Sequence, residues 1–212
     1  VVVSGQFSGD ASFESFDLSA DDGTTDAYII KYDENGTTLW AKQGTGEDLE
    51  RGMTISADDS NNIYVAGQFS GEITVDELYE NNMLNAIFVV KFSAEGDQEW
   101  IRSIGGTEEA LAYGMTTDGS NIFITGDFGA SLSILGGGLP QTFTSPYLVS
   151  LFILPFGSNG DFNWSSTAGS SSLVPSRDID YRNGELGIAG FYRCTFDEYS
   201  DQYGPGTFNS IG

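Results

Sequence analysis

Residues 26–71 read DAYIIKYDENGTTLWAKQGTGEDLERGMTISADDSNNIYVAGQFSG, and the rest of the chain repeats this stretch. A close copy, NAIFVVKFSAEGDQEWIRSIGGTEEALAYGMTTDGSNIFITGDFG, occupies residues 85–129, and a more divergent copy begins with SLFILPFGSNGDFNWSSTAG. Trp40, Trp100 and Trp164 mark equivalent positions, 60 and 64 residues apart. A fixed period of this length indicates that one supersecondary unit is stacked several times.

Segments with alternating apolar residues form the first strand type of the repeat. IYVAGQF at residues 63–69 alternates with period two, as strands do, and VVVSGQF, IFITGDF and LGIAGFY follow the same template. Each segment has a glycine in mid-strand, at Gly5, Gly67, Gly126 or Gly190. Because glycine weakens strand pairing, this column predicts a bulge or a close approach of another backbone.

Three further strands complete the repeat. An apolar run such as AYII ends in a glycine turn, DENG, SAEG or GSNG, and such turns favour hairpins. The partner strand carries the tryptophan, and after a loop a short strand of the GMTISA type leads back to the first strand. Four antiparallel strands in each repeat of about 60 residues can bury their faces by stacking radially as propeller blades.

The sequence therefore predicts an all-β chain of the β-propeller class, with about three and a half four-stranded blades in a single segment, residues 1–212. The predicted units are a partial blade at 1–43, blades at 52–104 and 113–167, and a partial blade at 177–212. An open arc would expose strand edges, which natural proteins avoid, so we expect a partial propeller that belongs to a longer chain. We expect the tryptophans and the glycine column to lie where blades meet. These inter-blade positions are Trp40, Trp100, Trp164, Gly5, Gly67, Gly126 and Gly190.

The order of residues resembles the bacterial SBBP repeats, named for the seven-bladed β-propeller. The first copy matches that pattern at Asp26, Lys31, Asp33, Gly36, Trp40, Asn62, Tyr64, Gly67 and Phe69. The second copy matches it at Lys91, Gly96, Trp100, Gly105, Gly106, Asn121, Phe123, Gly126 and Phe128. The third copy departs from it, because Pro155 replaces the lysine. The resemblance implies an exported or cell-surface bacterial protein, and many relatives look like cargo of the type IX secretion route.

The charge balance excludes some classes of partner. The chain has 31 acidic and 8 basic residues, a formal net charge of −23. Such a field repels phosphate backbones and anionic lipid surfaces, so nucleic-acid binding is not expected. No apolar run reaches the length of about 18 residues that a membrane helix needs, so membrane insertion is not expected either.

Few residues offer chemistry. The chain has no histidine and one cysteine, Cys194, so a serine or cysteine nucleophile would lack its usual base. The acidic pairs Asp21–Asp22, Asp58–Asp59 and Glu108–Glu109 fall in expected turns or loops, where a solvated surface is the simplest interpretation. Calcium is a weaker alternative, with Asp58, Asp59 and Asn61 or Asp197, Glu198 and Asp201 as candidate ligands, although neither group has the EF-hand spacing. We therefore predict no catalytic residue and no cofactor.

Binding is the expected function. The segments 8–25, 70–85 and 129–146 start alike and then diverge, and variable loops of this kind hold binding sites. We expect a non-catalytic extracellular or cell-surface module in binding, adhesion or scaffolding, with a protein or glycan partner on these loops. The alternative is a glycosidase or lyase, which would need carboxylates about 5–9.5 Å apart in a central pocket. A passive stalk is a third possibility.

Overall fold

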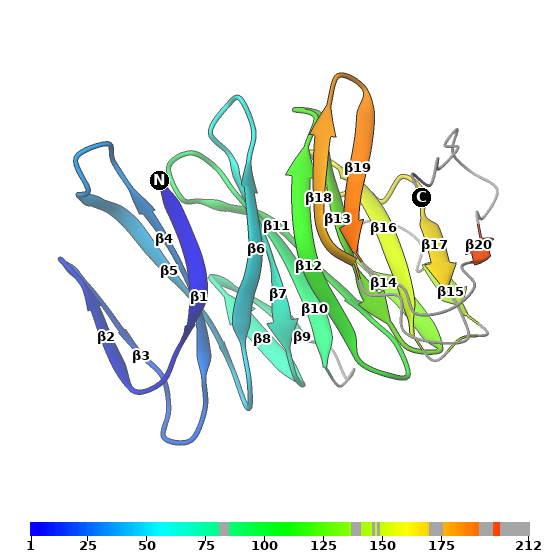
Figure 1. Cartoon of the computed structure of the whole chain (residues 1–212). Helices are drawn as coiled ribbons and strands as arrows, with labels where there is room; N and C mark the ends of the chain where they lie inside the picture. Colours follow the sequence, from blue (N-terminus) through cyan, green and yellow to red (C-terminus); the bar gives the residue numbers. More distant parts are fainter. Residues whose placement is uncertain are drawn as a thin grey trace.

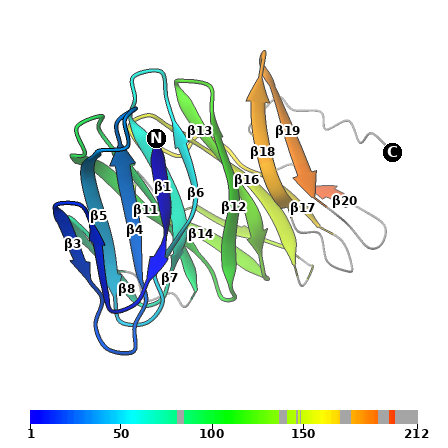
Figure 2. The same cartoon turned by 60° about the vertical axis from the view of Figure 1, so that its left-hand side comes forward.

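The computed structural model describes residues 1–80, 85–136, 141–145, 147, 149–169, 176–190 and 197–199, and in these residues the chain is built from β-strands. Sheets of antiparallel strands stand side by side along the molecule, each formed largely by one repeat (Figures 1 and 2). No helix in the described ranges is long and apolar enough to cross a membrane. We number the sheets as blades 1 to 4 in chain order.

The strands divide among the blades as follows. Blade 1 contains β1 (Val2–Phe7), β4 (Asp26–Tyr32), β5 (Thr38–Gly46), β8 (Glu72–Val75) and β9 (Glu77–Glu80). Blade 2 contains β6 (Arg51–Ala57), β7 (Ile63–Phe69), β10 (Ala86–Phe92), β11 (Gln98–Gly105), β14 (Ser131–Leu135) and β15 (Gln141–Thr144). Blade 3 contains β12 (Ala110–Thr117), β13 (Asn121–Phe128), β16 (Ser150–Gly157), β17 (Ser166–Gly169) and β20 (Asp197–Tyr199). Blade 4 contains β18 (Ser176–Arg182) and β19 (Glu185–Gly190), and a separate hairpin contains β2 (Asp10–Phe13) and β3 (Phe16–Ser19).

The predicted four-strand unit is present in blades 2 and 3. Blade 2 has the order β6-β7-β10-β11 and blade 3 the order β12-β13-β16-β17, and neighbouring strands are antiparallel. The GMTISA-type strands of successive blades, β6, β12 and β18, lie next to each other (Figure 1). β12 packs against both β6 and β18. This is the radial arrangement of a propeller, so the predicted fold class is confirmed.

The linking segments cross to the outer edge of the preceding blade. After β7 of blade 2, residues 72–80 form β8 and β9, which join the edge of blade 1. β8 pairs with β5, with Thr74 opposite Thr45. In the same way β14 pairs with β11, and β20 pairs with β17. Each pairing covers an otherwise free strand edge and ties two neighbouring blades together. The sequence indicated extra strands here but not the sheet that they join.

The strand bounds refine the predicted blade ranges. β5 extends to Gly46, beyond the first predicted unit, and β12 begins at Ala110, ahead of the third unit. The range 177–212 was predicted as one partial blade, but its strand β20 pairs with blade 3, leaving β18 and β19 as the described part of blade 4.

Three apolar layers fill the spaces between blades. The layer between blades 1 and 2 includes Ile29, Trp40, Val65 and Phe88, and the layer between blades 2 and 3 is of similar size. A smaller layer around Ile179 joins blades 3 and 4. Every residue of β7 and β10 is buried, since both faces of these strands are covered.

A bulge explains the glycine column. In blades 2, 3 and 4 the GMTISA-type strand (β6, β12 or β18) contains a one-residue bulge. Its pairing with the glycine-bearing strand shifts register next to the glycine, for example between Gly52 and Thr54. A Cβ atom on Gly67 would collide with the carbonyl oxygen of Arg51 and lie 2.5 Å from the ring of Phe88. A Cβ on Gly126 would meet the corresponding backbone oxygen and ring of blade 3. Only glycine leaves room for both neighbours.

Candidate functional site

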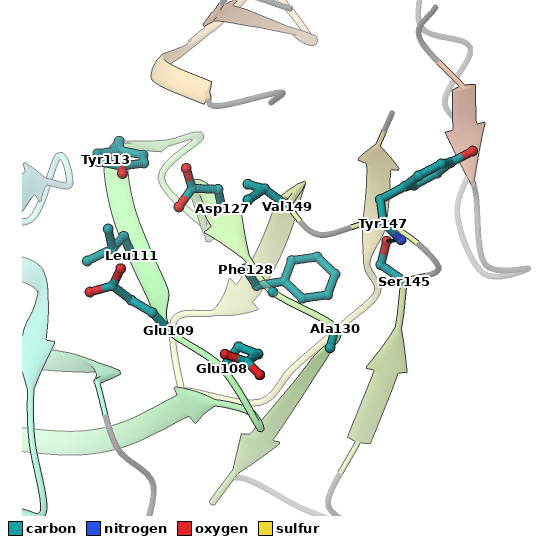
Figure 3. Close-up of a pocket in the computed structure, with 11 residues that line it drawn as sticks. Glu108, Glu109, Leu111, Tyr113, Asp127, Phe128, Ala130, Ser145, Tyr147 and Val149 are labelled. Carbon is teal, nitrogen blue, oxygen red and sulfur yellow. Dashed lines mark hydrogen bonds between the residues drawn. The ribbon is translucent and has the colours of Figure 1, made fainter. Parts of the chain in front are cut away.

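A pocket of about 620 Å³, lined by both charged and apolar groups, opens beside blade 3 (Figure 3). Its walls come from the loop before β12, from β12 and β13, and from the segment that leads to β16. The lining residues are Glu108, Glu109, Leu111, Tyr113, Asp127, Phe128, Gly129, Ala130, Ser145, Tyr147 and Val149. The carboxylates of Glu108, Glu109 and Asp127 line this pocket together with the half-buried apolar side chains of Leu111 and Val149, and Asp127 lies beside Val149 (Figure 3).

The position of Tyr113 depends on the bulge in β12. Its strand shifts register between Ala112 and Gly114, so Tyr113 is the extra residue. The guanidinium carbon of Arg177 lies 4.8 Å from the centre of the Tyr113 ring, and both side chains lower the pKa of the neighbouring Asp127 carboxyl. Since Arg177 belongs to β18, this contact joins blade 3 to blade 4.

The electrostatic state of the pocket follows from these neighbours. Burial raises the pKa of Asp127 to about 6, while the hydrogen bond with Tyr113 and the charge of Arg177 lower it and the charge of Glu109 raises it further. Burial, followed by the charge of Asp127, raises the pKa of Tyr113. Glu109 accepts a hydrogen bond of 3.2 Å from the amide nitrogen of Gln68 in blade 2. Residues of blade 3 therefore line the pocket, Gln68 of blade 2 and Arg177 of blade 4 contact them, and the pocket carries negative charge at neutral pH.

Such a pocket is suited to a positively charged group with an apolar stem. Glu108 and Glu109 are exposed to solvent, as predicted for this acidic pair, and both line the pocket. A lysine or arginine side chain could place its charge near these carboxylates and its methylene groups against Leu111 and Val149.

The candidate calcium ligands are arranged differently. The carboxylate of Asp58 accepts hydrogen bonds from the backbone N–H groups of Ser60 and Asn62, from the Asn62 amide, and from the Tyr64 hydroxyl, at 2.8–3.0 Å. Asn61 has a positive φ of 63° and lies in the same turn. Among the described residues no group of three or more acidic, histidine or cysteine side chains is placed to hold a metal ion. Asp58 thus serves as the acceptor that closes the turn.

The equivalent turn of the next repeat has the same construction. Asp118 accepts hydrogen bonds from the backbone of Ser120 and Asn121 and from the Asn121 amide. Asp59 is exposed beside Asp58. The side chains of Asp197 and Glu198, and residues Cys194 and Asp201, lie outside the part of the chain whose side chains are described.

The tryptophans occupy two kinds of position. Trp40 and Trp100 are 7% and 8% exposed and lie in the layers between blades 1 and 2 and between blades 2 and 3. Trp164 is half-buried and packs against the layer that joins blades 3 and 4. Of the glycine column, Gly5 faces Tyr28, and Gly190 pairs with Ser176 at the end of β19.

Sequence reasoning identified parts of the pocket but not the pocket itself. The segment 129–146 was expected to bind a partner, and Gly129, Ala130 and Ser145 line the wall. Neither Tyr113 nor Asp127 belongs to a recognisable motif. Asp127 could have been found by aligning the repeats, because it stands where the preceding repeat has Gln68 and adds a charge at a strand position next to the glycine column.

Comparison with known proteins supports the repeat architecture. No protein-family model matches the chain. The chain is 22% identical over 193 residues to an uncharacterized WD repeat-containing protein, L264, of Acanthamoeba polyphaga mimivirus, in a match that covers 76% of the chain and 14% of that protein. It is 27% identical over 101 residues to the regulatory protein FlaEY of Caulobacter vibrioides, covering 43% of the chain and 11% of that protein. The chain therefore spans only a small part of the length of these relatives.

Proposed function

We propose that the chain is a non-catalytic binding module that captures a basic segment of a protein partner, with a lysine or arginine side chain in the acidic pocket beside blade 3. One observation carries the proposal: Glu108, Glu109 and Asp127 share a pocket of about 620 Å³ with the half-buried apolar side chains of Leu111 and Val149. The net charge of −23 supports it, because a basic partner would be attracted over a long range.

The likeness to a WD repeat-containing protein supports a role as a repeat module. The resemblance to SBBP repeats adds the expectation of an exported or cell-surface location, with adhesion or a secretion-linked assembly as the setting. Protease treatment of intact cells tests the location, since a surface protein is degraded and an internal one survives.

Binding can be tested with peptides. Arrayed peptides that contain lysine or arginine beside apolar residues should bind the protein, and the same peptides with acetylated lysine should not. The double variant Glu108→Gln, Glu109→Gln should weaken binding by about tenfold or more. The double variant Glu95→Gln, Asp97→Asn is the matched control, since it removes two exposed carboxylates from blade 2. Equal binding by both double variants would contradict the proposal.

A carbohydrate-active enzyme is the second candidate, because the carboxyl of Asp127, with its raised pKa, shares the pocket with Glu109. Its carboxyl, however, lies beside Tyr113 and the charge of Arg177, both of which favour its ionised form, and this fits a fixed binding wall better than a proton donor. Hydrolysis of a polysaccharide panel that disappears in Asp127→Asn would favour the enzyme and contradict the binding module.

A further inference from the structure

Glu50 is a buried carboxyl that lies outside the pocket. It directly precedes β6, in the loop that follows β5, and its side chain is fully buried. Neither of its carboxylate oxygens makes a well-formed hydrogen bond. An ionised carboxylate is costly to bury without partners, so a buried group of this kind either stays neutral or strains the structure around it.

The carboxyl lies where the linking hairpin of β8 and β9 joins blade 1. A Cβ atom on Gly46, the last residue of β5, would collide with the carboxyl of Glu50 and would lie 2.5 Å from the carbonyl oxygen of Glu72, the first residue of β8. The side chain of Glu72 is exposed. A neutral carboxyl is compatible with a carbonyl oxygen at such a position, whereas a carboxylate adds a second negative oxygen and repels it.

The surrounding groups favour the neutral form of Glu50. Burial has the largest effect and raises the pKa of Glu50 to about 8. The backbone of Ser70 lowers this pKa, and the charges of Asp26 on β4 and Asp48 in the same loop raise it further. Arg51 is the charged residue that follows Glu50 in the chain. Below about pH 8 the folded protein therefore holds a neutral carboxyl at the junction.

The pairing beside this carboxyl is short. β8 pairs with β5 at two positions, with Thr74 opposite Thr45 and Ile73 opposite Gly46. The second of these positions is the one that the Glu50 carboxyl adjoins. Ionisation of Glu50 therefore acts directly on half of the pairing that holds the hairpin to blade 1.

Other contacts keep the hairpin in place. Ile73 and Val75 are fully buried, and a Cβ atom on Gly44 would lie 3.2 Å from Cγ2 of Val75. Lys42 of β5 forms an ion pair of 2.6 Å with Asp76 at the turn of the hairpin. Because these contacts do not involve Glu50, the hairpin remains on blade 1 in most molecules, and its release is a local opening of minor population.

The next junction has the same backbone arrangement without a carboxyl. Ala110 occupies the position of Glu50, and β14 pairs with β11 as β8 pairs with β5. A Cβ atom on Gly106 would collide with the carbonyl oxygen of Ser131, so this glycine also lies against the first residue of its linking strand. The molecule therefore contains two similar junctions, and one of them has an ionisable group.

We propose that Glu50 is a pH-sensitive switch on the linking hairpin: its protonated form keeps β8 paired with β5, and its ionisation favours local release of β8 from the edge of blade 1. Release frees the backbone groups of β5 at Thr45 and Gly46. Such a free strand edge can pair with another extended segment. The switch thus controls access to one edge of blade 1.

Proton linkage gives the direction and size of the effect. In the closed state the pKa of Glu50 is about 8, and in the open state we expect the ordinary value of 4.5. Between these values each opening releases one proton, so the equilibrium constant for opening should rise about tenfold per pH unit. Below and above this range it should level off. The hairpin is therefore held most tightly at acidic pH.

Amide hydrogen exchange, followed by NMR from about pH 5 to about pH 7.5, tests the proposal. Base catalysis alone speeds the exchange of any amide by about tenfold per pH unit, so the amide of Ile73 or Thr74 that faces β5 should speed up by about 100-fold per unit. In Glu50→Gln the same amide should return to about tenfold. The amides of β14 that face β11 are the internal control and should show about tenfold in both proteins, since Ala110 does not ionise.

Urea separates local release from global unfolding. Local opening exposes little surface, so exchange of the hairpin amide should depend weakly on urea, whereas the slowest amides of β10 should depend on it strongly. A dependence of about tenfold per pH unit at the β5-facing amide of the parent protein would overturn the proposal. A steeper dependence that persists in Glu50→Gln would also overturn it. The third contrary result is a steep dependence with the urea sensitivity of β10, because unfolding of the whole chain would then account for it.

Discussion

Trp100 in blade 2 donates its indole N–H to the carbonyl oxygen of Ser158 in blade 3, at 3.0 Å, although the two residues are 58 positions apart in the chain. The ring itself is 8% exposed and contacts Phe156 of blade 3. One side chain therefore supplies both apolar contact and a directed hydrogen bond between two blades.

Truncation of the indole should strongly destabilise the protein. Trp100→Ala should lower the free energy of unfolding by about 3–5 kcal/mol, because it removes a buried aromatic side chain and leaves a cavity. Trp100→Phe keeps much of the apolar contact and loses the hydrogen bond to Ser158. It should cost clearly less than the alanine variant. Urea unfolding gives both values, and a loss below about 1 kcal/mol for Trp100→Ala would remove this residue from the junction.

The glycine column should tolerate no side chain at Gly126. Gly126→Ala places a methyl group against the backbone oxygen of Leu111 and the ring of Phe152, so it should destabilise by about 2–4 kcal/mol. Gly187→Ala is the matched control in blade 4, since the nearest atom to its Cβ would be 4.0 Å away. Thermal and urea unfolding of both variants measure the difference. Similar stability of the two variants would show that the bulge is not a tight contact.

A buried carboxyl should make stability depend on pH. Glu50 is fully buried, and neither of its carboxylate oxygens makes a well-formed hydrogen bond. Burial raises its pKa from 4.5 to about 8; the backbone of Ser70 opposes this rise, and the charges of Asp26 and Asp48 add to it. Between these two pH values the folded protein holds a proton that the unfolded chain releases. Stability should therefore fall as pH rises from about 4.5 to about 8.

The variant Glu50→Gln should remove this part of the pH dependence. At pH 8.5 it should be more stable than the parent by roughly 2–4 kcal/mol, and at pH 4.5 the two proteins should be nearly equal. Glu47→Gln, at an exposed position in the same loop, is the control and should follow the parent. Urea unfolding across the pH range provides the comparison, and parallel curves for Glu50→Gln and the parent would contradict the assignment.

The turn at Asp58 should need its carboxylate but not calcium. Burial acts to raise the pKa of Asp58, but hydrogen bonds from Asn62, Tyr64 and Ser60 outweigh it and lower the pKa below its usual value. Asp58→Ala should cost about 1–3 kcal/mol because it leaves these donors without an acceptor. Addition of calcium at millimolar concentration, or of a chelator, should leave the thermal midpoint unchanged. A rise with calcium that Asp58→Ala abolishes would restore the metal site.

The blades could be predicted from the sequence because their causes are local and repeated. Alternation in IYVAGQF, the turn glycines and the tryptophan spacing each recur at the same period, and the glycine column indicated the bulge. The exchange of linking hairpins between blades is different. It depends on which strand edge is free in three dimensions, and the residues of β8 and β14 carry no mark of their partners β5 and β11.

The pocket was unpredictable for a related reason. It depends on contacts among three blades, with Tyr113 turned outward by a one-residue bulge and Arg177 arriving from β18. The buried carboxyl of Glu50, which lies outside the pocket, could have been found from the sequence. Glu50 is equivalent to Ala110 of the next repeat, because the backbone N–H of each residue donates to the corresponding neighbouring loop, at Thr25 and Asn85. A charge in an apolar column is a signal that sequence comparison of the repeats can detect.

The most direct test of the stacked-blade account is a double-mutant cycle between Gly160 and Trp100, measured by urea unfolding at low protein concentration. Gly36→Ala supplies the reference, because Gly36 and Gly160 have similar φ angles of 87° and 80° but no indole lies on Gly36. A Cβ atom on Gly160 would lie 2.7 Å from the ring of Trp100 and 2.8 Å from Nη2 of Arg102, the end of a flexible side chain. We expect Gly160→Ala to cost about 1–3 kcal/mol more than Gly36→Ala in the parent, and most of this excess to disappear once Trp100 is alanine. Equal costs in the parent, with additive effects of Gly160→Ala and Trp100→Ala, would contradict the docking of each indole on the turn of the next blade.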